Sequence, residues 1–160
     1  MKILVLSDSH RAEKPMLDAV RRERPDAIIH LGDHASDAQV LSSEFPLVPL
    51  SVVRGNCDLF EDNVPESVLM NWEGVRIFAA HGHRYGVKSN VLRLYYAAME
   101  KEAEVILFGH THIPYCEESD GVWLLNPGSC GRSRPSYGII EIENGIPLCR
   151  VEELYMEDVK

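Results

Sequence analysis

The sequence predicts an α/β fold, and three observations lead to that class. Apolar runs such as residues 3–6 and 27–31 are too short for helices and fit strands that are buried on both faces. Segments with helical spacing alternate with these runs in the first third of the chain. The last third contains consecutive strand-like runs joined by turn residues.

The first part of the chain reads as strand, helix, strand, helix, strand. Helical spacing over residues 16–20 predicts the first helix, and Pro25 predicts its end. Ser36 or Asp37 is expected to cap a second, short helix, and residues 47–53 form the third strand. This alternation predicts a parallel sheet.

The pattern changes in the middle of the chain. Residues 67–72 and 75–80 predict two strands joined by a tight turn. Ser89 or Asn90 is then expected to cap the longest helix of the chain, and residues 104–108 form another buried strand. Five apolar residues mark one face of that helix: Val91, Leu94, Tyr95, Ala98 and Met99.

The remainder of the chain is rich in strands. Four of them are predicted, over residues 115–118, 122–126, 137–143 and 146–151. The pair Asn144-Gly145 is the strongest signal for a hairpin turn in the chain. The tail from Glu152 is acidic and is expected to pack loosely.

Length and composition indicate a single globular domain over residues 1–160. The chain is 45% hydrophobic and 26% charged, so it can bury a sizeable core. Its net charge of −9 argues against a protein whose main affinity comes from neutralising a nucleic-acid backbone. A small phosphorylated ligand held by bound cations remains compatible with this charge.

Four cysteines are present, and none belongs to a C-x-x-C pair, so zinc knuckles and dithiol redox chemistry are unsupported. They are Cys57, Cys116, Cys130 and Cys149. The chain has no signal-like N-terminus and no long apolar span. We therefore expect a reduced, cytoplasmic protein without a membrane partner.

Polar side chains that can bind metals follow five of the predicted strands. They are Asp8 and His10, Asp33, Asn56, His81, and the pair His110 and His112. Open α/β sheets place their ligands at the carboxyl ends of the strands. Each motif alone is weak, but their joint occurrence, always after an apolar run, favours one shared site.

This set of donors argues for two metal ions. Mixed Asp, His and Asn ligands suit Mn, Fe or Zn better than Ca or Mg. Seven candidate ligands are too many for one ion, whereas a shared carboxylate can bridge two ions about 3.5–4 Å apart. Such a pair lowers the pKa of a bridging water and makes a hydroxide nucleophile available near neutral pH.

Five motifs together resemble the signature of the calcineurin-like metallophosphoesterase superfamily: Asp8-x-His10, Gly32-Asp33, Gly55-Asn56-x-Asp58, His81-Gly82 and Gly109-His110-x-His112. The short chain and its Gly-Asn-Cys-Asp motif resemble the small YfcE/MJ0936-type phosphodiesterase branch. The resemblance covers residues 1 to about 134. It implies a four-layer α/β/β/α sandwich with two mixed sheets and a dinuclear site at their edge.

The resemblance also implies a role for each candidate ligand. One divalent cation would be held by Asp8, His10 and His112, the other by Asn56, His81 and His110, with Asp33 bridging the two. Asn56, His81 and His110 would also be catalytic, and Asn56 would touch a phosphate oxygen. Mn²⁺ is the first choice for both cations, with Ni²⁺, Co²⁺, Zn²⁺ and Fe as alternatives.

Cys57 departs from the pattern of the larger phosphatases, which carry a histidine here that helps to protonate the leaving group. A thiol is a weak hydrogen-bond donor, so the departure favours diesters with good leaving groups, or another general acid. His34 and His83 are candidates for that acid. Asp58 is expected to orient a ligand or to cap the following turn.

The substrate side is less clear in the sequence. The glycine-rich loop over residues 126–135 contains Arg132 and Arg134, and Arg11 directly follows the first motif. Any of these arginines could reach an anionic substrate, or could lie on a solvated loop or a subunit contact. We expect a small phosphodiester as the substrate and a homodimer as the assembly.

The leading prediction is a metal-dependent phosphodiesterase that uses a hydroxide activated by two metals. One alternative is a non-catalytic scaffold that binds proteins, because Vps29 resembles this fold and has lost part of the metal set. All seven ligand positions here carry competent donors, so no such loss is visible. A phosphomonoesterase or a dinucleotide-polyphosphate hydrolase is the other alternative.

Overall fold

The computed structural model describes residues 1–154, in which ten strands form two sheets. The first sheet has the order β10 (Ile146–Glu153), β9 (Ser136–Glu143), β1 (Lys2–Leu6), β2 (Ala27–His30) and β3 (Leu50–Val52). The second has the order β4 (Ser67–Trp72), β5 (Val75–Ala80), β6 (Val105–Leu107), β8 (Val122–Asn126) and β7 (Tyr115–Ser119). The helices are α1 (Glu13–Glu23), α2 (Ala38–Glu44) and α3 (Leu92–Met99), with single 3₁₀ turns η1 (Ala35–Asp37) and η2 (His83–Tyr85).

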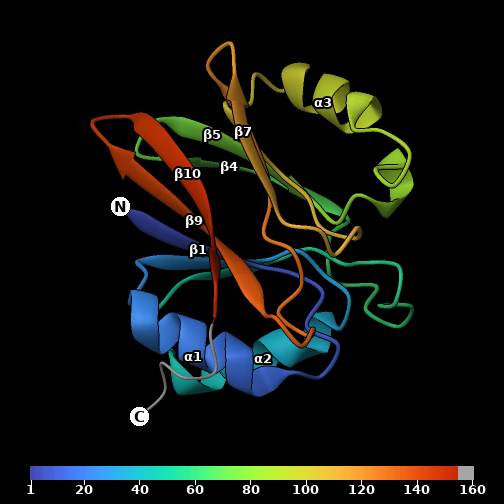
Figure 1. Cartoon of the computed structure of the whole chain (residues 1–160), viewed down its shortest axis with the longest axis vertical. Helices are drawn as coiled ribbons and strands as arrows, with labels where there is room; N and C mark the ends of the chain where they lie inside the picture. The colour runs from blue at the N-terminus through green and yellow to red at the C-terminus, as the bar shows by residue number, and fades with distance from the viewer. Residues whose placement is uncertain (155–160) are drawn as a thin grey trace.

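Both sheets are mixed. Strands β1, β2 and β3 are parallel, whereas β9 runs antiparallel to both β1 and β10. In the other sheet β5, β6 and β8 are parallel, and β4 and β7 pair antiparallel at the two edges. The helices α1 and α2 lie on one side of the strands and α3 lies on the other (Figure 1). The predicted four-layer sandwich with two mixed sheets is confirmed.

The alternation of side chains along each strand builds the layers. In β1, Ile3 and Val5 belong to the core between the two sheets, which also contains Ile77 of β5. Leu4 and Leu6 face the other way and pack in the cluster that contains apolar residues of α1 and α2. The two faces of β1 are therefore both buried, as its unbroken apolar run predicts.

Two helix predictions were wrong. The longest described helix is α1, with 11 residues, whereas α3 has only 8, because the chain turns away after Met99 and Glu102 takes a φ of 54°. Neither Ser36 nor Asp37 caps α2 with its side chain. The Asp37 carboxylate accepts hydrogen bonds from the Ser9 hydroxyl and a backbone N–H instead. The Asn90 side chain does accept the N–H of Leu92, at 3.1 Å, as predicted for the start of α3.

Several strand boundaries also differ from the prediction, most of all those of the third and the last strand. The third strand is limited to β3, which pairs with β2 only from Leu50, directly after Pro49. The last strand is longer than predicted, because Glu152 and Glu153 pair with β9. These two glutamates are thus part of a sheet and not of a loose tail, and the rest of the predicted tail, residues 155–160, lies outside the described residues. None of the helices within residues 1–154 is long and apolar enough to cross a bilayer.

Candidate metal centre

The candidate ligands lie at the carboxyl ends of strands from both sheets. Asp8 and His10 follow β1, Asp33 follows β2, Asn56 follows β3, His81 follows β5, and His110 and His112 follow β6. Because these strands are parallel within each sheet, their ends meet at one edge. Two hydrogen bonds join the sheets there: His81 Nδ1 donates to the Leu31 carbonyl at 2.8 Å, and the His110 N–H donates to Asp8 Oδ2 at 3.1 Å.

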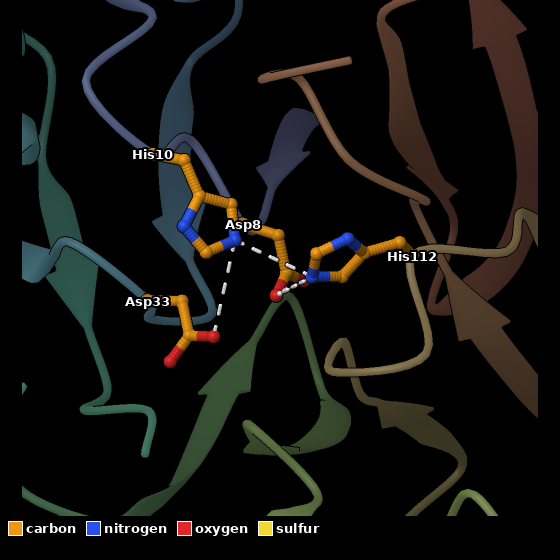
Figure 2. A group of neighbouring side chains, drawn as sticks. All are labelled: Asp8, His10, Asp33 and His112. Atoms are coloured by element: carbon orange, nitrogen blue, oxygen red, sulfur yellow. Dashed lines mark hydrogen bonds and ion pairs between the residues drawn. The ribbon is translucent and has the colours of Figure 1, made fainter. Parts of the chain in front are cut away.

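The first group of donors consists of Asp8, His10, Asp33 and His112, whose ligand atoms all lie within 4.8 Å of one another. His112 Nε2 is 2.9 Å from Asp8 Oδ1 and 3.4 Å from His10 Nε2. Figure 2 shows these side chains converging from separate segments. The group can therefore place two imidazoles and two carboxylates around one point.

The second group of donors consists of Asp33, His81 and His110, whose ligand atoms also lie within 4.8 Å of one another. Asp33 belongs to both groups of donors, and each of its two carboxylate oxygens faces a different group. Oδ1 is 3.4 Å from His81 Nε2, and Oδ2 is 4.0 Å from His10 Nε2. A carboxylate placed in this way can bridge two cations.

Two buried atoms of this site lack a hydrogen-bond partner within the described residues. Asp8 Oδ1 and His81 Nε2 are both buried without one. The other polar atom of each side chain is engaged: Asp8 Oδ2 accepts from the Ser7 hydroxyl at 2.6 Å, and His81 Nδ1 donates to Leu31. Buried polar atoms are normally satisfied. These two fit cation ligands, since a histidine ligand usually donates its second ring N–H to a carbonyl or carboxylate.

The electrostatics of the site couples its carboxylates and imidazoles: burial opposes the charged form of His81, but Asp33 and Asp8 outweigh it and raise the pKa of this ring. Burial opposes the charged form of Asp33, but His81 and the N–H of Cys57 outweigh it and lower the pKa of this carboxyl group. Burial also lowers the pKa of His110 to about 4, so its ring is neutral at pH 7. An ionised bridging carboxylate and a neutral imidazole are the forms that bind divalent metals.

Asn56 lies on the turn that packs against Asp33. A side chain at Gly55 would come within 2.2 Å of Asp33 Oδ1, so only glycine lets this turn approach so closely. The Cys57 N–H donates to the same oxygen at 2.9 Å. The Asn56 side chain is exposed and lies beside Cys57, with 3.5 Å between Nδ2 and Sγ. The structure thus puts the backbone at Asn56 next to the shared carboxylate.

Asp58 holds two of these loops together. Its buried carboxylate accepts the backbone N–H groups of Asp33, Ala35 and Gly55 at 2.9, 2.8 and 2.7 Å. These three bonds tie the loop after β2 to the loop after β3. Asp58 thus anchors the loop that carries Asp33, and the expectation that it orients a ligand stays a prediction.

Both extra histidines border the site. The His34 ring lies 5.3 Å from that of His10, and the His83 ring lies 5.4 Å from that of His81 and 6.1 Å from that of His110. His83 also lines a small cavity with Glu66 and Arg84. Desolvation, together with the charge of Asp33, raises the pKa of the Cys57 thiol to about 11.

Sequence reasoning missed a buried network behind the first motif. The Gly32 N–H donates to His30 Nδ1 at 3.2 Å, so the ring proton is on Nε2, which donates to the Ser9 hydroxyl at 3.2 Å. Ser9 in turn donates to Asp37 at 2.7 Å. The signal in the sequence was a histidine inside an apolar strand. It could not identify the partners, because His30 and Ser9 are 21 residues apart and Ser9 and Asp37 are 28 residues apart.

The fold and this site define a known class of protein. A model of the calcineurin-like phosphoesterase superfamily domain matches residues 1–145. The chain therefore belongs to this superfamily, whose members are metal-dependent phosphoesterases, as the resemblance of its motifs implies.

Three similar proteins show which members of the superfamily this chain resembles over most of its length. The chain is 36% identical over 148 residues to the probable metallophosphoesterase YsnB of Bacillus subtilis. The matched region covers 90% of this chain and 86% of YsnB. It is 27% identical over 164 residues to phosphodiesterase MJ0936 of Methanocaldococcus jannaschii, covering 89% and 94% of the two chains. A structure of the phosphoesterase YfcE from E. coli matches at a TM-score of 0.65, with 24% identity and 88% coverage of both chains.

Structures of Vps29 share the fold. Vps29 from Entamoeba histolytica in complex with zinc matches at a TM-score of 0.72, with 21% identity, 96% of this chain and 99% of that chain. At this level of identity the likeness concerns the fold alone.

Proposed function

We propose that this chain is a phosphodiesterase that works with two divalent cations at the strand-end site. The observation that carries the proposal is Asp33, which takes part in both groups of donors through different oxygens. The names of two relatives, phosphodiesterase MJ0936 and phosphodiesterase YfcE, support the class of substrate.

The two donor groups support the choice of ligands in this proposal, and Asn56 is added from the resemblance of its motif. Asp8, His10, Asp33 and His112 would hold one cation, and Asp33, His81, His110 and Asn56 would hold the other. When bound, such a pair of cations supplies a hydroxide near neutral pH and neutralises charge that develops on the phosphoryl oxygens. Mn²⁺ is our first choice, because mixed carboxylate and imidazole donors suit it.

The protein itself contributes orientation. The Leu31 carbonyl fixes the His81 ring so that Nε2 faces Asp33, and Ser7 and the His110 N–H fix Asp8 so that Oδ1 faces His112. Asp58 keeps the loop of Asp33 against the turn of Asn56. Positioned donors of this kind need little rearrangement during the reaction.

Cys57 favours diesters over monoesters. Its thiol stays protonated at neutral pH because the pKa is raised to about 11, and a thiol is a poor hydrogen-bond donor. A leaving group at this position would therefore receive little help from Cys57. Esters whose alcohol leaves readily, such as aryl diesters, are the expected substrates.

The test is hydrolysis of bis(4-nitrophenyl) phosphate by the purified protein with Mn²⁺, Co²⁺, Ni²⁺ or Zn²⁺, with 4-nitrophenyl phosphate as the matched monoester. We expect faster turnover of the diester and loss of activity after chelation. Absence of turnover with all four metals would contradict the proposal. Faster hydrolysis of the monoester would support a phosphomonoesterase, and a panel with dinucleotide polyphosphates separates the remaining alternative.

The scaffold alternative needs a test of its own. Vps29 of Entamoeba histolytica has been crystallised with zinc, so metal uptake alone does not separate a scaffold from an enzyme. Turnover that titrates with the metal content of the protein does separate them. Metal binding without turnover on the whole panel would favour the scaffold.

We also propose that residues 1–160 act as one domain and that two copies pair in solution. The edge strand β10 exposes Ile146 and Leu148, which are 71% and 55% accessible. Light scattering tests this pairing directly, and a monomeric mass would rule it out.

A further inference from the structure

We propose that the substrate carries a second phosphate besides its diester, and that Arg11 and Arg132 bind this group beside the first group of donors. The inference rests on the proposed function and names the substrate class. Its basis is a pair of arginines without side-chain partners in residues 1–154, one within the loop that bears Asp8 and His10 and one directly after a glycine packed on that loop.

The guanidinium groups of Arg11 and Arg132 are free. Both side chains are exposed, and neither forms a hydrogen bond or an ion pair within residues 1–154. Several other arginines of this acidic chain do find carboxylates: Arg54 and Arg84 pair with Glu66, and Arg150 pairs with Glu141. Within the described residues, exposed arginines without such a partner also occur far from the site, as at Arg24. What distinguishes Arg11 and Arg132 is that each directly follows a residue of the donor loop or one packed on it, where another anion can bind.

Arg11 is fixed by its backbone and not by its side chain. It directly follows the donor His10, and it has a φ of 70°, a left-handed conformation that costs energy for any residue other than glycine. Its N–H donates to Asp37 at 2.7 Å, and the Ala12 N–H closes the turn on the Ser9 carbonyl at 2.9 Å. The Asp37 carboxylate is thereby used by a backbone group and by Ser9, which leaves the guanidinium without an acid partner.

Arg132 directly follows a residue that packs on the same loop. The preceding Gly131 packs so closely on the loop that a side chain there would lie 2.4 Å from the Ser9 carbonyl oxygen. Upstream, the Ser129 hydroxyl donates to the Asp8 carbonyl at 2.8 Å and the Cys130 N–H donates to the Ser7 carbonyl at 3.1 Å. Arg132 thus follows a rigid contact with the residues that carry the first donors.

The chemistry of two guanidinium groups selects the ligand. Each presents a planar fork of N–H donors that matches the oxygens of a phosphate. A phosphodiester carries one negative charge, which the bound cations neutralise. A terminal phosphate carries about two, and it fits a pair of arginines a short distance from the cations. The substrate class is therefore a diester that also bears a monoester phosphate.

The test compares two esters that differ only in this group: 4-nitrophenyl thymidine 5′-phosphate with and without a 3′-phosphate. We expect kcat/KM of the wild type to be about tenfold or more higher for the 3′-phosphorylated ester, as for charge-assisted hydrogen bonds. Arg11→Gln and Arg132→Gln should each reduce this preference about tenfold. Arg24→Gln is the matched control, since Arg24 is an exposed arginine of positive φ at the far end of α1 and should keep the preference.

A binding experiment gives a second readout that does not need turnover. Calorimetry with thymidine 3′,5′-bisphosphate should show about tenfold weaker binding to Arg11→Gln and Arg132→Gln than to the wild type or Arg24→Gln. Equal kcat/KM for the two esters, or equal binding by all four proteins, would overturn the inference. The proposed function itself fails only when neither ester is hydrolysed with any of the four metals, so the two failures can be told apart.

Discussion

His81 at the end of one sheet donates its Nδ1 hydrogen to the carbonyl oxygen of Leu31 at the end of the other, over 2.8 Å. This bond orients the ring and directs the buried Nε2 at Asp8 and Asp33, at 3.9 and 3.4 Å. In the proposed centre, the same bond that joins the sheets would orient a metal ligand.

His81→Gln should lower metal affinity and activity together. A glutamine can keep a polar contact with Leu31 but cannot present an imidazole nitrogen to a cation. We expect about 100-fold weaker Mn²⁺ binding by calorimetry and an activity loss of about 100-fold or more. His34→Gln, a histidine at the rim of the site, is the control and should change the affinity far less. Unchanged affinity in His81→Gln would remove this residue from the ligand set.

Asp33→Asn should change the number of metal ions bound. The amide has the same shape but lacks the charge and the second anionic oxygen that a bridge requires. We expect the Mn²⁺ content, measured by plasma mass spectrometry, to fall from about two ions per chain to about one or fewer. Asp120→Asn, in the hairpin turn between β7 and β8, makes the same change of charge at the opposite edge and should keep both ions. A content of two ions in Asp33→Asn would rule out the bridging role.

Glu66→Gln should reduce activity with little loss of stability. Glu66 accepts from Arg54 at 2.7 Å and from Arg84 at 2.6 Å, which links the loop before Asn56 to the loop after His81. These groups are partly exposed to solvent, which screens the ion pairs, so the pairs contribute little to the free energy of unfolding. We expect kcat to fall several-fold while the midpoint of urea unfolding stays nearly unchanged. Glu73→Gln removes an ion pair with the N-terminus and serves as the matched variant, with no effect on kcat.

His30 should make the metal-free protein less stable in acid. Burial lowers the pKa of His30 to about 4, against 6.5 for the free side chain, so the unfolded chain binds a proton that the folded chain refuses. Its contribution to stability is complete above pH 6.5 and is lost as the pH falls towards 4. The integrated effect is about 3 kcal/mol.

Urea unfolding of the wild type and of His30→Gln between pH 7 and pH 4 measures this contribution. The difference in the free energy of unfolding between the two proteins should shrink by about 3 kcal/mol over that range. A difference that stays constant with pH would show that His30 is not the group responsible.

Patterns within short stretches of the sequence were enough to predict most of the fold. The hairpin of β4 and β5 lies where alternation and the tight turn predict it, and Asn144 and Gly145 join β9 and β10 with φ values of 52° and 75°. The length of α1 relative to α3 was underestimated, because only some of the residues of α1 are apolar. The length of β3 depends on pairing with β2, and such a partner is not visible within a short segment.

The strand-end motifs allowed the candidate site to be located, but not its supporting contacts. Asp8, Asp33 and His81 were found because each follows an apolar run and carries a donor. The hydrogen bonds from the Ala35 N–H to Asp58 and from His30 to Ser9 join residues more than 20 positions apart. No spacing rule links such pairs, and so these contacts required coordinates. The role of each donor as a metal ligand stays a prediction.

The sharing of donors between the sheets sets an order of events during biosynthesis. Asp8 and Asp33 lie in the early part of the chain, whereas His81 is made only after half of it has been translated, and His110 and His112 only after two thirds. A nascent chain that has formed only its first strands can offer carboxylates but not the complete set of donors. If the proposed centre binds its cations through these donors, capture of the cations would be a late event, and a loaded centre would report that both halves of the polypeptide have joined.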